Sequence, residues 1–391
     1  MRTAGIICEY NPFHRGHQLQ LEKTRGLVGP DGAIVCLMSG YFVQRGEPAL
    51  YPPRLRAEAA VRSGADLVLE LPITAAVNAA GYFAEKAVWC LTRLGCVDTL
   101  SFGSECGSLL PLSQAAELLD SPELEEALRA SLSTGCSYAA ARTAAMERLG
   151  ADGTILTRPN NALGIEYIRS IRRLGSAMEP WTFQRDMDIP SAGMLRQRLT
   201  DDTLLYKFEN PQQGDNPERW LPQKQLYHGA AMHTLQNGER AMLAVLRTLP
   251  DEAFARMAFE AEGISSKVKK ACRTENSLDG ILSRCKSKRF AYSRLKRTLL
   301  CLYLGLSAAD MEREIPYLRV LACNDRGRQV LARARKESCI PLVSGAIPHT
   351  AAAEAYFALE QRAADLYTLF APEDTREKWG MLRAERPIVL S

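Results

Sequence analysis

Residues 5–21 read GIICEYNPFHRGHQLQL, and this stretch sets two histidines three positions apart directly after a short apolar run. The apolar run predicts a buried strand over 4–8, and the residues after His17 predict a helix. His14 and His17 therefore stand where a first strand passes into a first helix, with Gly16 between them. In an open parallel sheet this edge binds ligands, and a helix N-terminus beside a glycine favours an anion. The pattern predicts a phosphate site; the alternatives are a histidine pair that only caps the helix, or half of a zinc site.

The first two hundred residues repeat this alternation of strand and helix. Further strands are predicted over 33–40, 65–73, 97–105 and 180–186, and helices over 53–64, 79–95, 112–149 with a break near Gly135, 160–175, and Ser191 to Arg198. Buried strands that alternate with helices indicate a parallel α/β sheet.

Beyond about residue 205 the pattern changes. A stretch rich in Asn, Gln, Pro and Gly over 208–223 reads as a linker. After it there is almost no strand pattern, only helical runs over 239–249, 251–262, 277–286, 291–306 and 351–370. We therefore expect an α/β protein with a Rossmann-like parallel-sheet domain over 1–205 and a mostly α-helical domain over 206–391.

Composition indicates a cytoplasmic protein with no membrane partner. The chain has 391 residues, of which 46% are hydrophobic. No apolar run approaches the roughly 18 residues that span a bilayer, and the N-terminus lacks the long apolar stretch of a signal peptide. The eleven cysteines show no C-x-x-C spacing, which suits reduced thiols better than a disulfide framework or a zinc site.

Positive charge is concentrated in one segment. Residues 267–297 hold eleven Lys or Arg against Glu275 and Asp279, a net charge of +9 in a chain that carries only +4. Such a block predicts a polyanionic partner such as RNA, because cations neutralise phosphates and interleaved aromatic rings stack on unpaired bases; a solvated charged helix face is the alternative. The candidate RNA-binding residues are Lys269, Lys270, Lys288, Arg289, Tyr292, Arg294, Lys296 and Arg297, while Phe290 between them could belong to the core.

Several motifs together resemble a known family. His-x-Gly-His after a strand resembles the HxGH signature of the nucleotidylyltransferase superfamily. The wider stretches resemble the bacterial tRNA(Met) cytidine acetate ligases over essentially the whole chain; they are GIICEYNPFHRGH, MSGYFVQRGEPA (38–49), FGSE (102–105), PNNALGIEYI (159–168) and SKRFAYSRLKR (287–297). The resemblance implies a nucleotidylyltransferase domain that joins acetate and ATP into acetyl-adenylate. It also implies transfer of the acetyl group to N4 of the wobble cytidine of elongator tRNA(Met), giving N4-acetylcytidine.

The resemblance also implies roles for individual residues. His14 and His17 would be catalytic, on the ATP phosphates. Gly103 would admit the nucleotide close to the backbone, although it could be only a turn glycine. The remaining ATP-binding residues would be Asn160 or Asn161, Arg185, and the loop formed by Ile7, Cys8, Glu9, Tyr10, Asn11, Pro12, Phe13, His14, Arg15, Gly16, His17, Gln18, Leu19 and Gln20. Simpler readings make Asn160 a helix cap and pair Arg185 with Asp186 on the surface.

Other positions stay open. Ser191 and Arg196 resemble a Ser-Thr-x-x-Arg element of related transferases, but alanine follows the serine here, so a phosphate contact of Arg196 is undecided. Gln44, Arg45 and Glu47 could shape an acetate pocket, meet the anticodon nucleotide, or form a solvated loop. Mg²⁺ is expected with ATP, with no protein ligand identified.

Two other functions compete with this one. The same adenylate chemistry could serve a small-molecule acceptor, or the chain could be a non-catalytic RNA-binding protein.

Adenylation gives a carboxylate a phosphate leaving group, so no protein nucleophile is required and catalysis depends on positioning and on charge stabilisation.

Overall fold

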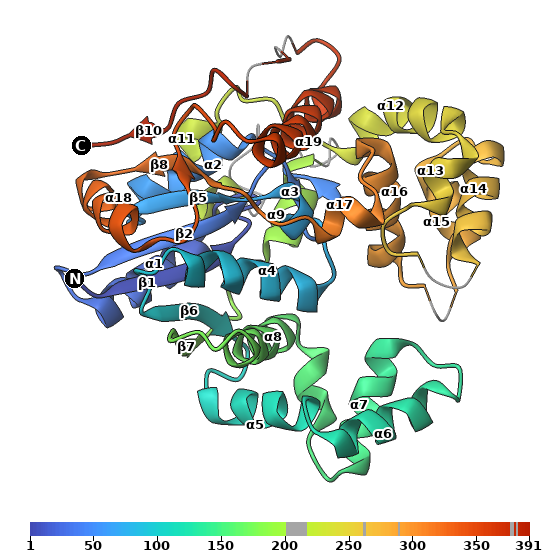
Figure 1. Cartoon of the computed structure of the whole chain (residues 1–391), viewed down its shortest axis with the longest axis horizontal. Helices are drawn as coiled ribbons and strands as arrows, with labels where there is room; N and C mark the ends of the chain where they lie inside the picture. The colour runs from blue at the N-terminus through green and yellow to red at the C-terminus, as the bar shows by residue number, and fades with distance from the viewer. Residues whose placement is uncertain (201–216, 261–262, 288–289, 376–378, 381) are drawn as a thin grey trace, which may run out of the picture.

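A mixed sheet with helices on both faces forms the centre of the molecule (Figure 1). The computed structural model describes residues 1–391 except 201–216, 261–262, 288–289, 376–378 and 381. The sheet order is β10-β8-β5-β2-β1-β6-β7, with β9 paired to β8. The strands are β1 (Thr3–Cys8), β2 (Ala33–Ser39), β5 (Leu67–Leu71), β6 (Thr99–Ser104), β7 (Glu179–Gln184), β8 (Leu318–Cys323), β9 (Leu342–Val343) and β10 (Ile388–Val389), and a separate hairpin is formed by β3 (Phe42–Val43) and β4 (Glu47–Pro48).

The five strands predicted in the first two hundred residues are present and are parallel to one another. They lie in the order β5-β2-β1-β6-β7, so the winding of the chain reverses between β1 and β6. In a doubly wound sheet the loops at such a reversal diverge and leave a crevice at the carboxyl ends of the strands. The expected Rossmann-like fold is confirmed.

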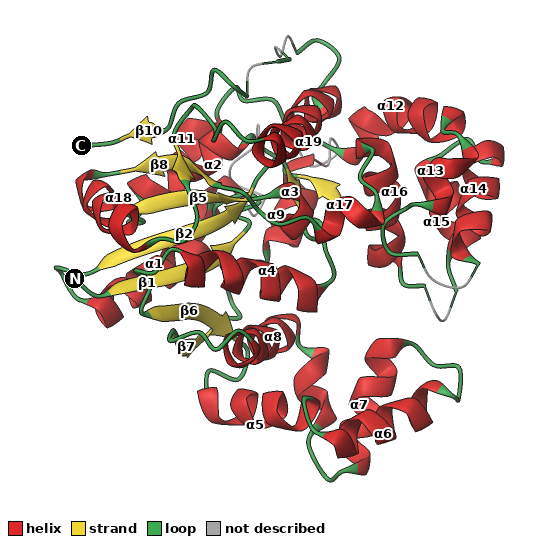
Figure 2. Ribbon diagram, viewed as in Figure 1, coloured by secondary structure: helices red, strands yellow, loops and turns green. Residues whose placement is uncertain are grey.

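Helices cover the sheet and extend from it (Figure 2). In the first part of the chain they are α1 (Arg15–Val28), α2 (Pro53–Arg62), α3 (Ile73–Ala76), α4 (Ala80–Arg93), α5 (Leu109–Leu119), α6 (Pro122–Leu132), α7 (Tyr138–Arg148), η1 (Gly153–Thr157), α8 (Pro159–Arg173) and α9 (Ala192–Thr200). They continue as η2 (Pro217–Trp220), α11 (Lys224–Tyr227), α12 (Leu235–Thr248), α13 (Asp251–Ala255), α14 (Ile264–Thr274), α15 (Leu278–Cys285), α16 (Tyr292–Leu304), α17 (Ala308–Glu312), α18 (Asp325–Glu337), α19 (Ala351–Tyr367) and η3 (Thr368–Phe370).

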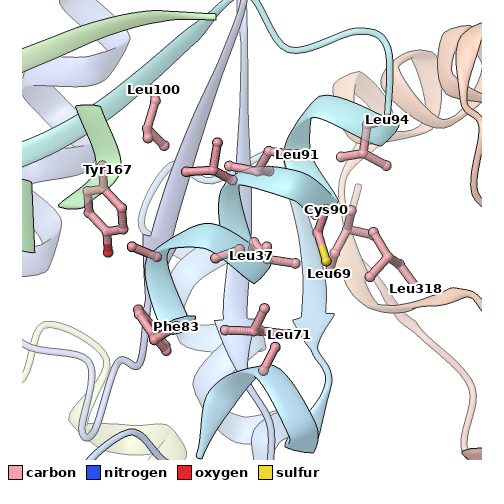
Figure 3. Packing of buried hydrophobic residues seen from close by; sticks show 14 of the residues in the cluster. Leu37, Leu69, Leu71, Phe83, Cys90, Leu91, Leu94, Leu100, Tyr167 and Leu318 are labelled. Carbon is pink, nitrogen blue, oxygen red and sulfur yellow. The ribbon is translucent and has the colours of Figure 1, made fainter. Parts of the chain in front are cut away.

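Alternate residues of the buried strands enter two different cores. In β2, Ala33, Val35 and Leu37 pack on the face that α4 covers, where Leu69, Leu71, Phe83 and Leu91 also lie (Figure 3). Their neighbours in sequence pack on the opposite face against α1 and α2. The period of two residues in a strand explains how one continuous apolar run can supply both cores.

The helices α12 to α16 form a helical module with an apolar core of its own. Figure 1 shows this module beside the sheet, at the opposite side from the chain ends. Phe42 of the β3–β4 hairpin is fully buried in the core of the module, although it follows directly on β2. The hairpin therefore ties the central sheet to the helical module.

The prediction of almost no strand beyond residue 205 is wrong for β8, which lies antiparallel beside β5. Arg319 interrupts the apolar pattern of this strand, yet it is buried. Its guanidinium lies 3.2 Å from a Glu70 carboxylate oxygen and 2.8 Å from one of Glu360. A strand from the second half of the chain thus completes the sheet, so residue 205 does not separate the strands of the sheet from the helical module.

Two of the expected helices are shorter than their sequence patterns indicated. The stretch 112–149 forms three helices, because Ser121 caps α6 and Pro122 occupies its first position. The stretch 251–262 is helical only to Ala255, after which Met257 forms a β-bridge. Of the expected linker 208–223, the part up to residue 216 lies outside the described residues. No described helix is both long and apolar enough to cross a bilayer.

Candidate active site

A cavity of about 470 Å³ opens at the carboxyl ends of β1, β6 and β7, where the winding of the chain reverses. The loop after β1 and the start of α1 form one wall, and the start of α8 with the end of β7 forms another. Predicted site residues that line it are Ile7, Cys8, Glu9, Tyr10, Asn11, His14, Gly16, His17, Leu19, Gln20, Gly103, Asn160 and Arg185, together with Gln44 and Arg45.

Two histidines begin helix α1. His14 is its N-cap, and its Nδ1 accepts a hydrogen bond from the Gly16 N–H at 3.0 Å. His17 Nδ1 accepts in return from the His14 N–H at 3.2 Å. The two rings lie 3.8 Å apart, centroid to centroid. The histidines therefore form a capping box, in which both side chains satisfy backbone donors that the first helical turn leaves free. The expected capping role and a ligand role are compatible, because each ring uses only one nitrogen for the cap.

Both imidazoles are held neutral. Burial and the positive charges of Arg185 and Arg196 lower the pKa of His14 to about 3. Burial, together with the adjacent His14 and Arg185, also lowers the pKa of His17 well below its usual value. Since Nδ1 of each ring accepts a hydrogen bond, the one proton of each neutral ring is on Nε2. The site thus holds two Nε2–H groups that can donate to an anion without adding positive charge.

Cations surround the histidines. Arg185, at the end of β7, lines the cavity. A Cβ on Gly103 would lie 3.0 Å from Arg185 Cγ and 3.2 Å from the Phe183 ring. Gly103 therefore gives the room in which Arg185 lies against the end of β6. Arg196 donates through Nη1 to the Asn11 carbonyl at 2.7 Å and does not line the cavity.

A reciprocal set of hydrogen bonds joins the turn after β6 to the start of α8. The Glu105 carboxylate accepts from the Asn160 N–H, the Asn160 side-chain amide and the Asn161 N–H at 2.7–3.2 Å. In return Asn161 Oδ1 accepts from the Glu105 and Cys106 N–H groups. Asn160 thus lines the cavity with its amide orientation fixed, whereas Asn161 holds the turn and does not line it.

Four more predicted loop residues lie outside the cavity lining: Pro12, Phe13, Arg15 and Gln18. Phe13 is fully buried in the core beside α1. Arg15 pairs with Glu22, about two turns along the exposed side of the helix. The positions of Arg15 and Gln18 follow from helix α1, since consecutive residues of one turn face different directions.

Sequence reasoning missed most of the apolar wall of the cavity. Helix α8 contributes Pro159, Ala162, Leu163 and Tyr167, and their spacing is that of one helix face, a signal that could have found them. The other unpredicted lining residues are Ala80, Phe83, Phe183, Asp186, Ile189 and Ala192. A cavity lined by apolar side chains together with Arg185 suits a ligand with an aromatic base and phosphates.

Arg56 holds the loops of the site together. It is fully buried on α2, and its guanidinium donates to the carbonyl oxygens of Glu9, Ser39, Gly40 and Tyr51. The Glu9 carbonyl follows β1, those of Ser39 and Gly40 stand at the end of β2, and that of Tyr51 lies just before α2. Arg56 thereby fixes the loop after β1 relative to the loop after β2, and the charge is balanced by backbone dipoles instead of a carboxylate.

The described residues offer no ready-made metal site. None of their groups of three or more His, Cys, Asp or Glu side chains could hold an ion. Glu9 and Asp186 are the carboxylates among the lining residues, and one Glu9 oxygen already accepts from the Gln44 N–H. The residues present therefore do not fit a protein-built Mg²⁺ site, and the expected Mg²⁺ would take most of its ligands from phosphate and water.

The basic segment is less uniform than its sequence indicated. Lys270 is exposed on α14, while Lys269 pairs with Asp251. Lys296 pairs with Glu47 of the β3–β4 hairpin, and Arg297 is buried instead of lying on a solvated face.

Three further residues of this segment, Tyr292, Arg294 and Phe290, also contact neighbouring groups. Tyr292 is half-buried, with the Lys286 ammonium 4.7 Å from its ring. Arg294 donates to the Phe259 carbonyl, and Phe290 packs at the edge of the core of the helical module. Lys288 and Arg289 lie outside the described residues.

Comparison with known proteins identifies the family to which the chain belongs. The model of the family described as "HIGH Nucleotidyl Transferase" matches residues 1–380. The chain belongs to this family of nucleotidyl transferases, whose signature corresponds to the His-x-Gly-His at the start of α1.

Within that class the similarity extends to one group of enzymes. The chain is 32% identical to the tRNA(Met) cytidine acetate ligase of Acetivibrio thermocellus, over 88% of each chain. It is 36% identical to the enzyme of that name from Syntrophotalea carbinolica, over 88% of this chain and 85% of the other. The crystal structure of Thermotoga maritima TmcAL bound with alpha-thio ATP superposes with a TM-score of 0.88 at 29% identity, covering all of both chains. The resemblance to the tRNA(Met) cytidine acetate ligases is confirmed.

Proposed function

We propose that this chain is an ATP-dependent tRNA(Met) cytidine acetate ligase. It activates acetate as acetyl-adenylate and acetylates N4 of the wobble cytidine of elongator tRNA(Met). The observation that carries the proposal is the pair of neutral imidazoles at the start of α1, which line a cavity together with Arg185 and the apolar residues of α8. The relatives carry the same name, and the related crystal structure holds an ATP analogue.

The first step suits a site that donates hydrogen bonds without a protein nucleophile. An acetate oxygen attacks the α-phosphorus of ATP, a P–O bond forms, and the bond to the β-phosphate breaks with pyrophosphate as the leaving group. The His14 and His17 Nε2–H groups and the Arg185 guanidinium stabilise the negative charge that builds on the phosphate oxygens. Because the imidazoles are neutral, they keep this arrangement across the physiological pH range.

The second step transfers the acetyl group to RNA. The N4 amine of the cytidine attacks the acyl carbon, the bond to AMP breaks, and N4 loses one proton. This amine is a weak nucleophile because its lone pair is delocalised into the ring, so a mixed anhydride is an appropriate donor. The helical module, with Lys270 exposed on α14, would receive the tRNA body. Such a substrate places the enzyme in the cytoplasm.

The test separates activation from transfer. Protein is incubated with ATP and labelled acetate, with and without tRNA, and both acetyl-adenylate and labelled RNA are measured. We expect His17→Ala to abolish adenylate formation and to leave tRNA affinity nearly intact, while the exposed His349→Ala serves as a matched control. We expect Lys270→Glu to weaken tRNA binding and to leave adenylate formation nearly intact.

Other outcomes would support another function. Adenylate without labelled RNA indicates a small-molecule acceptor, and RNA binding without any adenylate indicates a non-catalytic RNA-binding protein. Loss of both activities in each variant would contradict the division between the cavity and the helical module.

A further inference from the structure

Arg297 of helix α16 is buried without an acidic partner. It is 7% exposed, its Nε is buried without a hydrogen-bond partner, and no described carboxylate lies within ion-pair distance. The other two buried arginines among the described residues are saturated: Arg56 donates to four carbonyls, and Arg319 pairs with two carboxylates. An unpaired charge inside a protein is costly. Among the described residues, Arg297 is therefore the one buried arginine whose guanidinium has neither a carboxylate partner nor a set of backbone carbonyls to donate to.

A second arginine lies beside it. Arg294, one turn earlier on α16, is half-buried and donates through Nη2 to the Phe259 carbonyl at 2.8 Å. Aromatic rings hold both guanidinium groups, since Arg297 Cζ lies 5.6 Å from the ring centroid of Phe259 and Arg294 Cζ lies 5.3 Å from that of Phe290. Burial and the neighbouring Arg294 lower the pKa of Arg297 to about 10, so it remains charged at neutral pH. Glu260 acts on Arg294 only at a distance.

The arginine pair lies where the helical module meets the active-site wall. Gly46, at the turn of the β3–β4 hairpin, has φ +77°, and a Cβ there would lie 2.6 Å from the Arg297 backbone nitrogen. The next residue, Glu47, pairs with Lys296. Arg45, which precedes Gly46, is exposed and lines the cavity. The backbone of Arg297 thus packs against the hairpin one residue from the cavity lining, and Arg297 itself does not line the cavity.

We propose that Arg294 and Arg297 bind a backbone phosphate of the RNA, next to the nucleotide whose base enters the cavity. The inference rests on the proposed function. A phosphodiester supplies the two acceptor oxygens that a guanidinium fork binds well. The phosphates of ATP are a poorer match, because neither arginine lines the cavity. RNA is the partner because its chain carries further phosphates away from a base that is held in the cavity.

The experiment compares Arg297→Met in the full chain with the wild type. Methionine keeps an unbranched apolar stem, so removal of an unpaired buried charge should raise the Tm of the free protein. The same substitution should weaken tRNA binding roughly tenfold and reduce the slope of log K against log salt by about 0.7. Arg284→Met is the matched control, because Arg284 of the same module is paired with Glu275. It should leave the salt slope at the wild-type value.

The effect of ATP on the Tm distinguishes an RNA phosphate from a phosphate of ATP as the group that the two arginines bind. ATP alone should raise the Tm of the wild type and of Arg297→Met by the same amount. A reduced ATP effect in the variant would assign the arginines to the nucleotide and overturn the inference, as would a raised Tm with unchanged tRNA affinity and salt slope. If Arg297→Met does not fold, Arg294→Gln on the half-buried partner should give the same loss of slope. Failure of the proposed function is visible separately, as wild-type protein that forms no acetyl-adenylate.

Discussion

Acidification should destabilise this protein through a histidine that stays almost entirely neutral in the folded state at pH 5. The pKa of His14 is about 3 in the folded protein, against about 6.5 in an unfolded chain. As the pH falls through 6.5, the unfolded state binds a proton that the folded state does not bind. Protonation therefore favours the unfolded state, and the contribution of His14 to stability is present above that pH and is lost below it.

The size of the effect follows from the two pKa values. At pH 5, about 97% of unfolded molecules and about 1% of folded ones carry a proton on His14. Integrated from pH 7 to pH 5, this difference lowers the free energy of unfolding by about 2 kcal/mol. His17 acts in the same direction, because burial also lowers its pKa.

The assay is urea unfolding at pH 7 and at pH 5, for the wild type and for His14→Asn. Asparagine can still accept the Gly16 N–H hydrogen bond and so keeps the helix cap. We expect the wild type to lose about 2 kcal/mol more than the variant between the two pH values. Nitrogen NMR of the five histidines gives a second readout, in which His14 and His17 stay neutral at pH 5 with the proton on Nε2.

Parallel pH profiles for the wild type and His14→Asn would refute the reasoning. So would a His14 ring that titrates between pH 5 and pH 7, or one that carries its proton on Nδ1. Either result would mean that the ring is less shielded than the structure indicates, and that charged imidazoles meet the phosphate.

Three further predictions concern residues in and around the cavity. Gly103→Ala should weaken ATP binding roughly tenfold, about 1.4 kcal/mol, because its Cβ would displace Arg185; calorimetry with unchanged affinity would contradict this. Glu105→Gln should lower the free energy of unfolding by about 1–2 kcal/mol, since the carboxylate accepts three hydrogen bonds from the start of α8; an unchanged urea midpoint would be the opposing result. Gly46→Ala should cost about 1–3 kcal/mol of stability because it strains a positive φ and presses on Arg297; acetyl transfer to tRNA should fall more than adenylate formation, and an equal fall would count against this coupling.

Much of the fold could be predicted because its signals are local. Each strand, loop and helix of the first two hundred residues carries its own pattern, and a parallel sheet brings the ends of such strands to one edge. The positions of His14, His17 and Gly103 at the cavity follow from this geometry alone. The spacing of the apolar residues on α8 indicates one helix face, but the sequence analysis did not assign that face to the cavity.

The remainder depends on contacts between distant parts of the chain. The sequence left Asn160 and Asn161 as equivalent candidates, and only the turn of α8 places the first at the cavity and the second against Glu105. The sequence did not distinguish the buried Arg297 from the other basic residues of its segment. The burial of Arg297 depends on the packing of Phe259 and of the β3–β4 hairpin around it, which no local pattern indicates. Strand β8 was missed because the partners of Arg319 come from β5 and α19.

The antiparallel pairing of β5 with β8 bears on the order in which the protein can assemble during synthesis. Strand β5 leaves the ribosome early, but its outer neighbour is made only after the helical module has been completed. Until then, an apolar strand has one side open to any other extended chain. A fragment that ends at residue 205 should therefore associate with itself, and nascent chains should need protection until residues 318–323 emerge.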